Sequence, residues 1–165
     1  MGEAGDNPHP QKRPPHTFAT RGDKMVVVMV GLPARGKSYI AGRVTKYLSF
    51  FYGVPCRTFN VGNYRRKLAG SFQPASFFDP GNLDAAAVRR RATEMAMEDL
   101  VAWMNEVAPR RVESGEHRFV SGDFGALGIF DATNSTGERR SWIVSRLAPL
   151  GVKIIFLEAV CNIER

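Results

Sequence analysis

A short glycine-containing motif constrains the fold of this chain more than any other feature of its sequence. Residues 31–38 read GLPARGKS and fit the pattern G-x-x-x-x-G-K-[ST], and the apolar run from Met25 to Val30 stands directly before them. This pattern is typical of a phosphate-binding loop, or P-loop, which lies between a strand and a helix. The next ten residues carry apolar side chains at helical spacing, at Ile40, Val44, Tyr47 and Leu48. The order of strand, loop and helix predicts a nucleotide-binding site.

The predicted nucleotide site consists of nine consecutive residues: Gly31, Leu32, Pro33, Ala34, Arg35, Gly36, Lys37, Ser38 and Tyr39. Because Gly31 and Gly36 lack a Cβ atom, the backbone N–H groups can come close to phosphate oxygens. Lys37 supplies an ammonium group for the β- and γ-phosphates, and the hydroxyl of Ser38 is the predicted Mg²⁺ ligand. The positive end of the following helix points at the same phosphates.

Apolar strands alternate with amphipathic helices along the rest of the chain. The pattern predicts strands at 25–30, 56–60, 127–130 and 153–157, and helices at 38–51, 64–69, 85–107 and 138–150. Asp84 is the predicted N-cap of the long helix, whose methionines we expect to fill the core. Such alternation predicts an α/β fold of three layers, in which helices cover a mostly parallel sheet.

Length and composition favour a single domain. The chain has 165 residues, of which 44% are hydrophobic, and this is enough for a real core. Residues 1–24 are rich in proline, which predicts a disordered leader. Residues 25–165 are predicted to form the domain, and residues 109–125 a surface loop within it. The chain shows no bilayer-spanning stretch and no secretory signal. Its two cysteines are too few for a framework of disulfides or of metal ligands. We therefore expect a cytoplasmic protein without a membrane partner.

The net charge of +7 comes from clusters of arginine and lysine spread along the chain. Solvated helix faces explain Arg90, Arg91, Arg110 and Arg111 without any ligand. A nucleic-acid partner is not expected, because no aromatic stacking platform accompanies the charge. The remaining cations are candidates for binding smaller anions.

A second chemical group follows the apolar strand at 127–130. Parallel strands deliver their carboxyl ends to one edge of a sheet, so Asp131 should emerge near Lys37 and Ser38. There its carboxylate can hold Mg²⁺ through water or orient a hydroxyl nucleophile. Polar groups follow on the same rim, and for Ser135 and Thr136 the sequence leaves helix capping and ligand contact open.

Four blocks of the sequence together resemble one known family. They are GLPARGKSY at 31–39, FNVGNYRR at 59–66, FDATN at 130–134 and EAVCN at 158–162. In this order they resemble the kinase domain of the 6-phosphofructo-2-kinase/fructose-2,6-bisphosphatase family, and the wording ATNST after Asp131 is closest to plant and algal members. The resemblance implies ATP and Mg²⁺ as cofactors and transfer of the γ-phosphoryl group to the 2-hydroxyl of fructose 6-phosphate. This reaction makes fructose 2,6-bisphosphate and regulates glycolysis.

The resemblance also implies roles for individual residues. Asp131, Lys37 and Cys161 match catalytic positions of the family, with Ser38 and Asp131 at the metal. The positions that match sugar-phosphate contacts are Arg65, Arg89, Thr133 and Arg139. Arginine suits this task, because its planar fork binds phosphate oxygens in pairs.

Compared with the family, this sequence ends soon after Cys161, so the resemblance implies that the C-terminal part of the kinase domain is missing. The resemblance also implies that the phosphatase domain of the family is missing. Residues 109–125 correspond to an insertion relative to the family. Two alternatives therefore stay open at this point: a non-catalytic ATP-binding or regulatory module, and another P-loop kinase of small molecules. The sequence also leaves the oligomeric state open, with a homodimer as one option.

Overall fold

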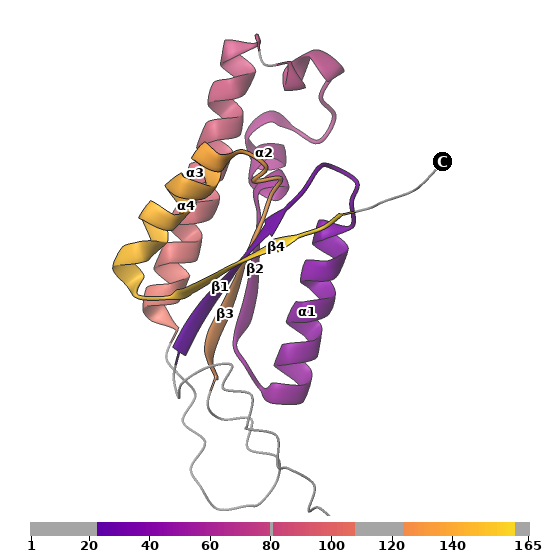
Figure 1. The fold of residues 1–165 in the computed structure, drawn as a ribbon. Helices are drawn as coiled ribbons and strands as arrows, with labels where there is room; N and C mark the ends of the chain where they lie inside the picture. Colours follow the sequence, from indigo (N-terminus) through magenta and orange to yellow (C-terminus); the bar gives the residue numbers. More distant parts are fainter. Residues whose placement is uncertain (1–22, 80, 108–123, 161–165) are drawn as a thin grey trace, which may run out of the picture.

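The computed structural model describes residues 23–79, 81–107 and 124–160 (Figure 1). Within these ranges the strands are β1 (Asp23–Val30), β2 (Cys56–Asn60), β3 (Phe124–Asp131) and β4 (Lys153–Glu158). They form one sheet in the order β2-β3-β1-β4, and every pair of neighbours is parallel. The predicted parallel α/β fold is confirmed.

Helices cover both faces of this sheet. They are α1 (Lys37–Tyr52), α2 (Val61–Ala69), α3 (Leu83–Glu106) and α4 (Gly137–Leu147), with short 3₁₀ turns η1 (Ala75–Phe78) and η2 (Ala148–Leu150). In Figure 1, α1 lies on one side of the sheet, whereas α3 and α4 lie on the other. None of the helices in the described part of the chain is long and apolar enough to cross a membrane.

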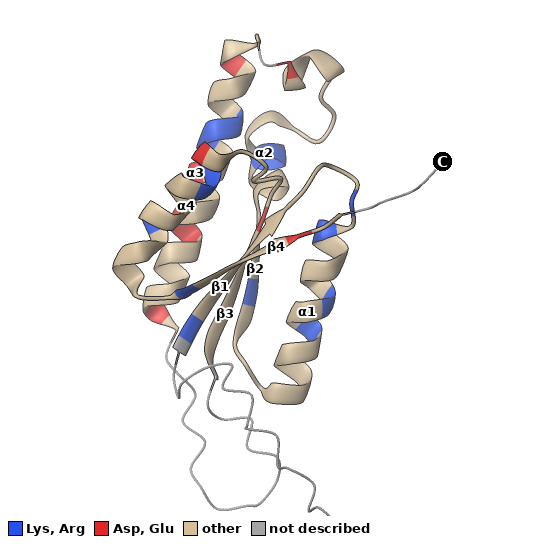
Figure 2. Cartoon of the chain, viewed as in Figure 1, with Lys and Arg blue, Asp and Glu red and all other residues tan. Residues whose placement is uncertain are grey.

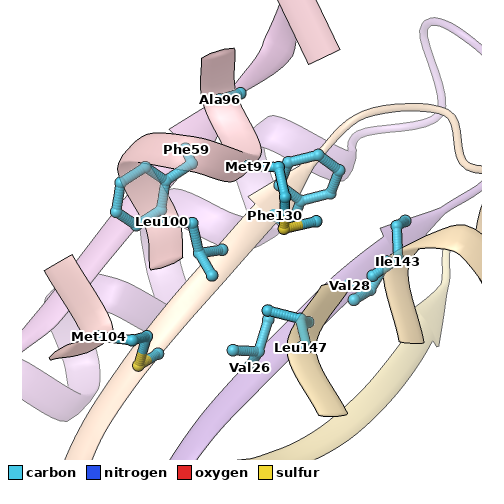
Figure 3. Close-up of a cluster of buried hydrophobic side chains, with 10 residues drawn as sticks. All are labelled: Val26, Val28, Phe59, Ala96, Met97, Leu100, Met104, Phe130, Ile143 and Leu147. Atoms are coloured by element: carbon cyan, nitrogen blue, oxygen red, sulfur yellow. The ribbon is translucent and has the colours of Figure 1, made fainter. Parts of the chain in front are cut away.

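The central strand β1 separates two hydrophobic clusters. Val27 and Met29 face α1 and pack around Ala41, whereas Val26 and Val28 face α3 and α4. This burial on both faces explains why β1 is a continuous apolar run. Figure 3 shows the cluster on the α3 and α4 side, which consists of Val26, Val28, Phe59, Ala96, Met97, Leu100, Met104, Phe130, Ile143 and Leu147. Met97 and Met104 of α3 are buried in this cluster as predicted, whereas Met95 is only partly buried and lies outside it.

The start of α3 differs from the prediction. We predicted Asp84 as the N-cap, but Asn82 takes this position and its side chain accepts a hydrogen bond of 3.0 Å from the backbone N–H of Ala85. Asp84 lies in the first turn, where its carboxylate faces the positive end of the helix. Asn and Asp are about equally good N-caps, so composition does not separate two candidates that lie two residues apart.

One residue of α1 was assigned to the wrong face. Helical spacing placed Tyr47 with the core residues, but its side chain is 52% exposed and packs against the rings of Phe51 and Tyr52. A tyrosine has an apolar ring and a polar tip, so it tolerates the boundary of a helix face. The other predicted core positions of α1 are partly buried.

Several predicted boundaries shift by a few residues. Asp23 and Lys24 belong to β1 rather than to the leader, and β3 already begins at Phe124 within the predicted loop 109–125. The predicted helix 138–150 ends as α4 at Leu147 and continues as the turn η2. The rest of the leader and of the loop lies outside the described residues, as do the predicted surface arginines 110 and 111.

Charged side chains gather at one end of the sheet. Figure 2 shows Lys and Arg on α2, on the turns of α3 beside it and at the start of α1. Arg90 and Arg91 of α3 are exposed as predicted, and Arg91 forms exposed ion pairs with Glu94 and Glu98. Such exposed pairs stabilise a fold by less than about 1 kcal/mol.

Leu100 and Leu83 provide a test of where the stability of α3 resides. Leu100 is 0% exposed and Leu83 is 79% exposed on the same helix. We expect Leu100→Ala to lower the free energy of unfolding by about 2–5 kcal/mol, because it removes buried methyl groups and leaves a cavity. Leu83→Ala, the same chemical change, should alter it by less than about 0.5 kcal/mol. Urea denaturation followed by circular dichroism measures both, and equal effects would contradict the described packing.

Candidate functional site

The P-loop passes from β1 into α1 with an unusual backbone. Gly31 and Gly36 have φ angles of 129° and 77°, a region that residues with a Cβ rarely adopt. A Cβ on Gly31 would lie 2.8 Å from the backbone oxygen of Ala159, and the Gly31 N–H donates to the backbone oxygen of Thr133 at 2.9 Å. Gly31 is therefore constrained by its neighbours β4 and the β3–α4 loop, whereas Gly36 is constrained by its φ angle alone.

Lys37 is held inside this loop. Its side chain is 8% exposed, and its Nζ donates a hydrogen bond of 2.6 Å to the backbone oxygen of Leu32. The ammonium is thus kept against the loop by a neutral acceptor. Its full positive charge remains available to an anion, as the predicted role at the phosphates requires.

Asp131 and Ser38 meet as the sequence predicted. Asp131 is the last residue of β3 and is only 2% exposed. The hydroxyl of Ser38, in the first turn of α1, donates to its Oδ2 at 2.6 Å. The pair brings a hydroxyl and a carboxylate from two elements to one point beside the P-loop.

Asn60 joins this pair, and the sequence reasoning had not assigned it a role. It is the last residue of β2 and pairs in register with Asp131. Its Nδ2 donates to Asp131 Oδ2 at 2.5 Å and to the Ser38 oxygen at 3.2 Å, while its Oδ1 accepts from the backbone N–H of Asn63 at 3.0 Å. Asn60 therefore orients the carboxylate and caps α2 at the same time. Its place at the carboxyl end of a strand was the signal that could have identified it.

The oxygen groups at this point fit a magnesium ion that also binds phosphate. Mg²⁺ prefers carboxylate, hydroxyl and water oxygens, and proteins commonly hold it by one or two side chains plus the phosphates of a substrate. Ser38 and Asp131 supply such a pair. Within the described ranges no group of three or more His, Cys, Asp or Glu residues could hold a metal by itself. The site thus suits a metal that arrives with a nucleotide.

The loop between β3 and α4 is built by its own polar groups. Asn134 is 3% exposed and donates to the backbone oxygen of Met29 at 2.9 Å. Thr136 is the N-cap of α4, with its hydroxyl accepting from the N–H of Arg139 at 3.2 Å. Arg140 donates to the backbone oxygen of Ser135 at 2.8 Å. Capping is thus observed for Thr136, and ligand contact stays a prediction for Ser135 and Thr136, which both line the cavity described next.

One cavity of about 560 Å³ collects the predicted ligand-binding residues. Lys37 and Ser38 line it together with Asp131 and Thr133. The three arginines predicted at the sugar phosphate also line it, and they come from three different helices: Arg65 from α2, Arg89 from α3 and Arg139 from α4. The cavity thus joins an anion-binding loop, a carboxylate and these three guanidinium groups, and Arg66 of α2 lines it as a fourth arginine.

Aromatic rings lie beside the first three of these arginines, and none of the three forms a salt bridge within the described residues. The Arg139 guanidinium lies 5.3 Å from the centre of the Trp142 ring. Burial lowers the pKa of Arg139, and the nearby carboxylates of Glu138 and Glu94 oppose this shift. Arginine stays protonated in proteins, so the group remains a cation in the cavity.

A half-buried phenol connects helix α2 to α3. The hydroxyl of Tyr64 donates to Asp99 Oδ2 at 2.7 Å. Burial and the hydrogen bond to this carboxylate raise the pKa of Tyr64 to about 12, so the phenol stays neutral and keeps donating at physiological pH. The residue after it is Arg65, so this contact places one cavity arginine relative to α3.

A second cavity of about 670 Å³ lies on the other side of the P-loop. Its lining includes Leu32 and Arg35 of the loop and Glu158 to Val160 after β4. Tyr39 lines neither this cavity nor the first; its ring is 69% exposed beneath the guanidinium of Arg43. Cys161, predicted from the resemblance alone, lies outside the described residues.

Comparisons with known structures identify the class of fold. Two structures of the APS kinase CysC from Mycobacterium tuberculosis, one in complex with AMPPNP and APS, are each 19% identical to this chain. The complex superimposes with a TM-score of 0.54, and the match covers 88% of this chain and 66% of the kinase chain. For the Cys556Ala mutant the TM-score is 0.51, and the match covers 86% of this chain and 77% of the kinase chain. The fold is that of the P-loop kinases.

Comparisons of sequence identify the family. The family model of 6-phosphofructo-2-kinase matches residues 15–110 and 114–165. The mouse 6-phosphofructo-2-kinase/fructose-2,6-bisphosphatase 1 is 39% identical over 83% of this chain, the Arabidopsis thaliana 6-phosphofructo-2-kinase/fructose-2,6-bisphosphatase 41% over 86%, and a probable 6-phosphofructo-2-kinase of Schizosaccharomyces pombe 40% over 87%. The chain spans 25%, 16% and 19% of these relatives. It belongs to the 6-phosphofructo-2-kinase family, as the four sequence blocks predicted.

Asn60 offers a test of how the metal-side groups are held. Asn60→Ser keeps a side-chain oxygen that can cap α2 but removes the amide donor to Asp131. We expect Mg²⁺-nucleotide affinity to fall by about tenfold, because hydrogen bonds to charged groups contribute about 1.5–3 kcal/mol. The melting temperature should change little. Isothermal titration calorimetry with Mg²⁺-AMPPNP and thermal unfolding measure the two quantities.

The matched control for this test is Asn82→Ala. Asn82 caps α3 by the same 3.0 Å hydrogen bond but does not contact Asp131. Its loss should lower stability by about 1 kcal/mol and leave Mg²⁺-nucleotide affinity unchanged. If Asn60→Ser lost stability but kept its affinity, Asn60 would be a helix cap and nothing more.

Proposed function

We propose that this chain provides the 6-phosphofructo-2-kinase activity of its family, transferring a phosphoryl group from ATP to the 2-hydroxyl of fructose 6-phosphate. The observation that carries the proposal is the cavity of about 560 Å³, which the P-loop residues Lys37 and Ser38 share with Asp131 and a cluster of arginines. A phosphoryl donor and a phosphorylated acceptor need such a combination of charges in one place.

The donor side of the proposed reaction is the P-loop. Lys37 and the start of α1 would hold the ATP phosphates, and Ser38 and Asp131 are the residues that would hold Mg²⁺. The metal, when bound, neutralises negative charge on the phosphates. The second cavity, beside Leu32 and Val160, has room for the nucleoside part of ATP.

The acceptor side is the arginine cluster. The phosphate of fructose 6-phosphate is a dianion at neutral pH, and the guanidinium groups of Arg65, Arg89 and Arg139 can each bind its oxygens in pairs. With the phosphate fixed there, the sugar ring would extend toward Thr133 and Asp131. Asp131, already a hydrogen-bond acceptor for Ser38, would accept a hydrogen bond from the sugar hydroxyl and orient it. The main contributions of the protein are thus alignment and charge.

The direct test is product formation by the purified chain with Mg²⁺-ATP and fructose 6-phosphate, read as the acid-labile fructose 2,6-bisphosphate. Lys37→Met should lower kcat at least about 100-fold, because it removes the cation nearest the transferred phosphates. Circular dichroism should show an unchanged fold. Equal turnover by the variant would refute the assignment. Nucleotide binding without any turnover by the native chain would favour a regulatory ATP-binding module instead.

Arg65→Leu tests the acceptor side separately. It should raise the KM for fructose 6-phosphate by roughly 10–100-fold, because hydrogen bonds to charged groups contribute about 1.5–3 kcal/mol. The KM for ATP should stay within about twofold of the native value, because we assign Arg65 of α2 to the sugar phosphate and not to the nucleotide. The exposed Lys46 on α1 lies outside this cavity, so Lys46→Leu is the control that removes a cation elsewhere. An unaltered sugar KM in Arg65→Leu would remove this residue from the site.

A further inference from the structure

The turn η1 buries one aromatic ring between two helices. Of its residues, Phe77 is 8% exposed, whereas its neighbours Ser76 and Phe78 are exposed. The segment around it contributes little else to the core, and Phe72 a few residues earlier is 97% exposed. The burial of a single ring in an otherwise exposed connection calls for a local reason.

That reason lies in the two arginines that flank the ring. The guanidinium of Arg89, from α3, lies 5.8 Å from the centre of the Phe77 ring, and that of Arg65, from α2, lies 6.0 Å from it. The Arg65 guanidinium also lies 5.3 Å from the centre of the Phe78 ring. In addition, Arg89 Nη1 donates to the backbone oxygen of Phe77. One residue therefore contacts both cations.

The turn itself is attached to the start of α3. The backbone N–H of Phe77 donates to the oxygen of Pro74 at 3.0 Å, and the Nδ2 of Asn82 donates to the oxygen of Ser76 at 3.1 Å. Asn82 also caps α3. The ring is thus fixed relative to the helix that carries Arg89.

The electrostatics explain why an aromatic ring occupies this place. Arg65 and Arg89 line the same cavity, so their positive charges repel each other. Within the described part of the chain neither forms a salt bridge. The face of an aromatic ring attracts a guanidinium through its quadrupole and uses none of its N–H donors. A carboxylate in the same position would neutralise the charge and occupy those donors.

We propose that Phe77 is a positioning residue for the anionic end of the sugar substrate, holding Arg65 and Arg89 at the spacing that lets both bind one phosphate group. This inference rests on the proposed function, because it takes the phosphate of fructose 6-phosphate as the ligand. Phe77 does not line the cavity, so it acts through the two arginines. Its contribution therefore belongs to substrate binding and not to nucleotide binding.

The test replaces the ring while preserving its apolar character. Phe77→Leu should weaken fructose 6-phosphate binding about tenfold, measured by calorimetry, and raise the sugar KM by a similar factor. The KM for ATP should not change. Phe77→Tyr keeps the aromatic face and should restore the native sugar affinity. Phe72→Leu, the same substitution at a nearly fully exposed ring, is the control and should bind as the native chain does.

Binding of unphosphorylated fructose separates positioning from general structural damage. If Phe77 acts through the arginines at the phosphate, Phe77→Leu and the native chain should bind fructose equally poorly. A native-like affinity for fructose 6-phosphate in Phe77→Leu would overturn the inference, as would an equal loss in Phe77→Tyr. Thermal unfolding of each variant identifies one that fails to fold. If Phe77→Leu does, Phe77→Met, which also removes the aromatic face, takes its place, with the same expected loss and the same overturning result.

The same measurements distinguish this inference from the proposed reaction. A native chain that binds fructose 6-phosphate but forms no product would refute the proposed activity and leave the affinities to decide the role of Phe77. A native chain that does not bind fructose 6-phosphate would overturn both.

Discussion

The parallel pairing of β3 with both β1 and β2 is the constraint on which the site depends. In the register of the sheet, Val28 of β1 lies beside Phe130 and Asn60 of β2 lies beside Asp131. The chain that leaves β1 therefore enters the P-loop at the same edge where β2 and β3 deliver an amide and a carboxylate. A shift by one residue would turn Asp131 toward the other face of the sheet and separate it from Ser38. The hydrophobic clusters on both faces maintain this register.

The sequence was sufficient to predict the elements that carry strong periodic or motif signals. The strand at Cys56–Asn60 was predicted with its observed bounds, and the meeting of Asp131 with Ser38 followed from the parallel topology alone. Both predictions rest on rules that hold for any sheet of this class, namely alternating burial and the common edge of parallel strands. The family resemblance then supplied the proposed roles of the arginines, which no periodicity indicates.

The features that were missed depend on which of several similar polar groups makes a contact. Asn60 and Asn82 are both asparagines before a helix, but one also reaches a carboxylate and the other a turn. The turn η1 carries no apolar period, so the burial of Phe77 could not be anticipated before α2 and α3 were placed. Likewise, the choice between Asp84 and Asn82 as the cap of α3 depends on a shift of two residues. These are tertiary contacts, which local propensity does not specify.

Around the cavity, several charged side chains are held in place by contacts with neutral groups. Lys37 is held by a backbone oxygen, Asp131 by a hydroxyl and an amide, and Arg65 by aromatic faces. Each contact fixes the position of a charge without cancelling it. An ion pair between these groups would have been easier to form, because both signs are present within one cavity, but it would leave less charge for a ligand. A site proposed to bind several anionic groups at once would need such neutral supports. The amide of Asn60 provides one for Asp131, and the ring of Phe77 provides another for Arg65 and Arg89.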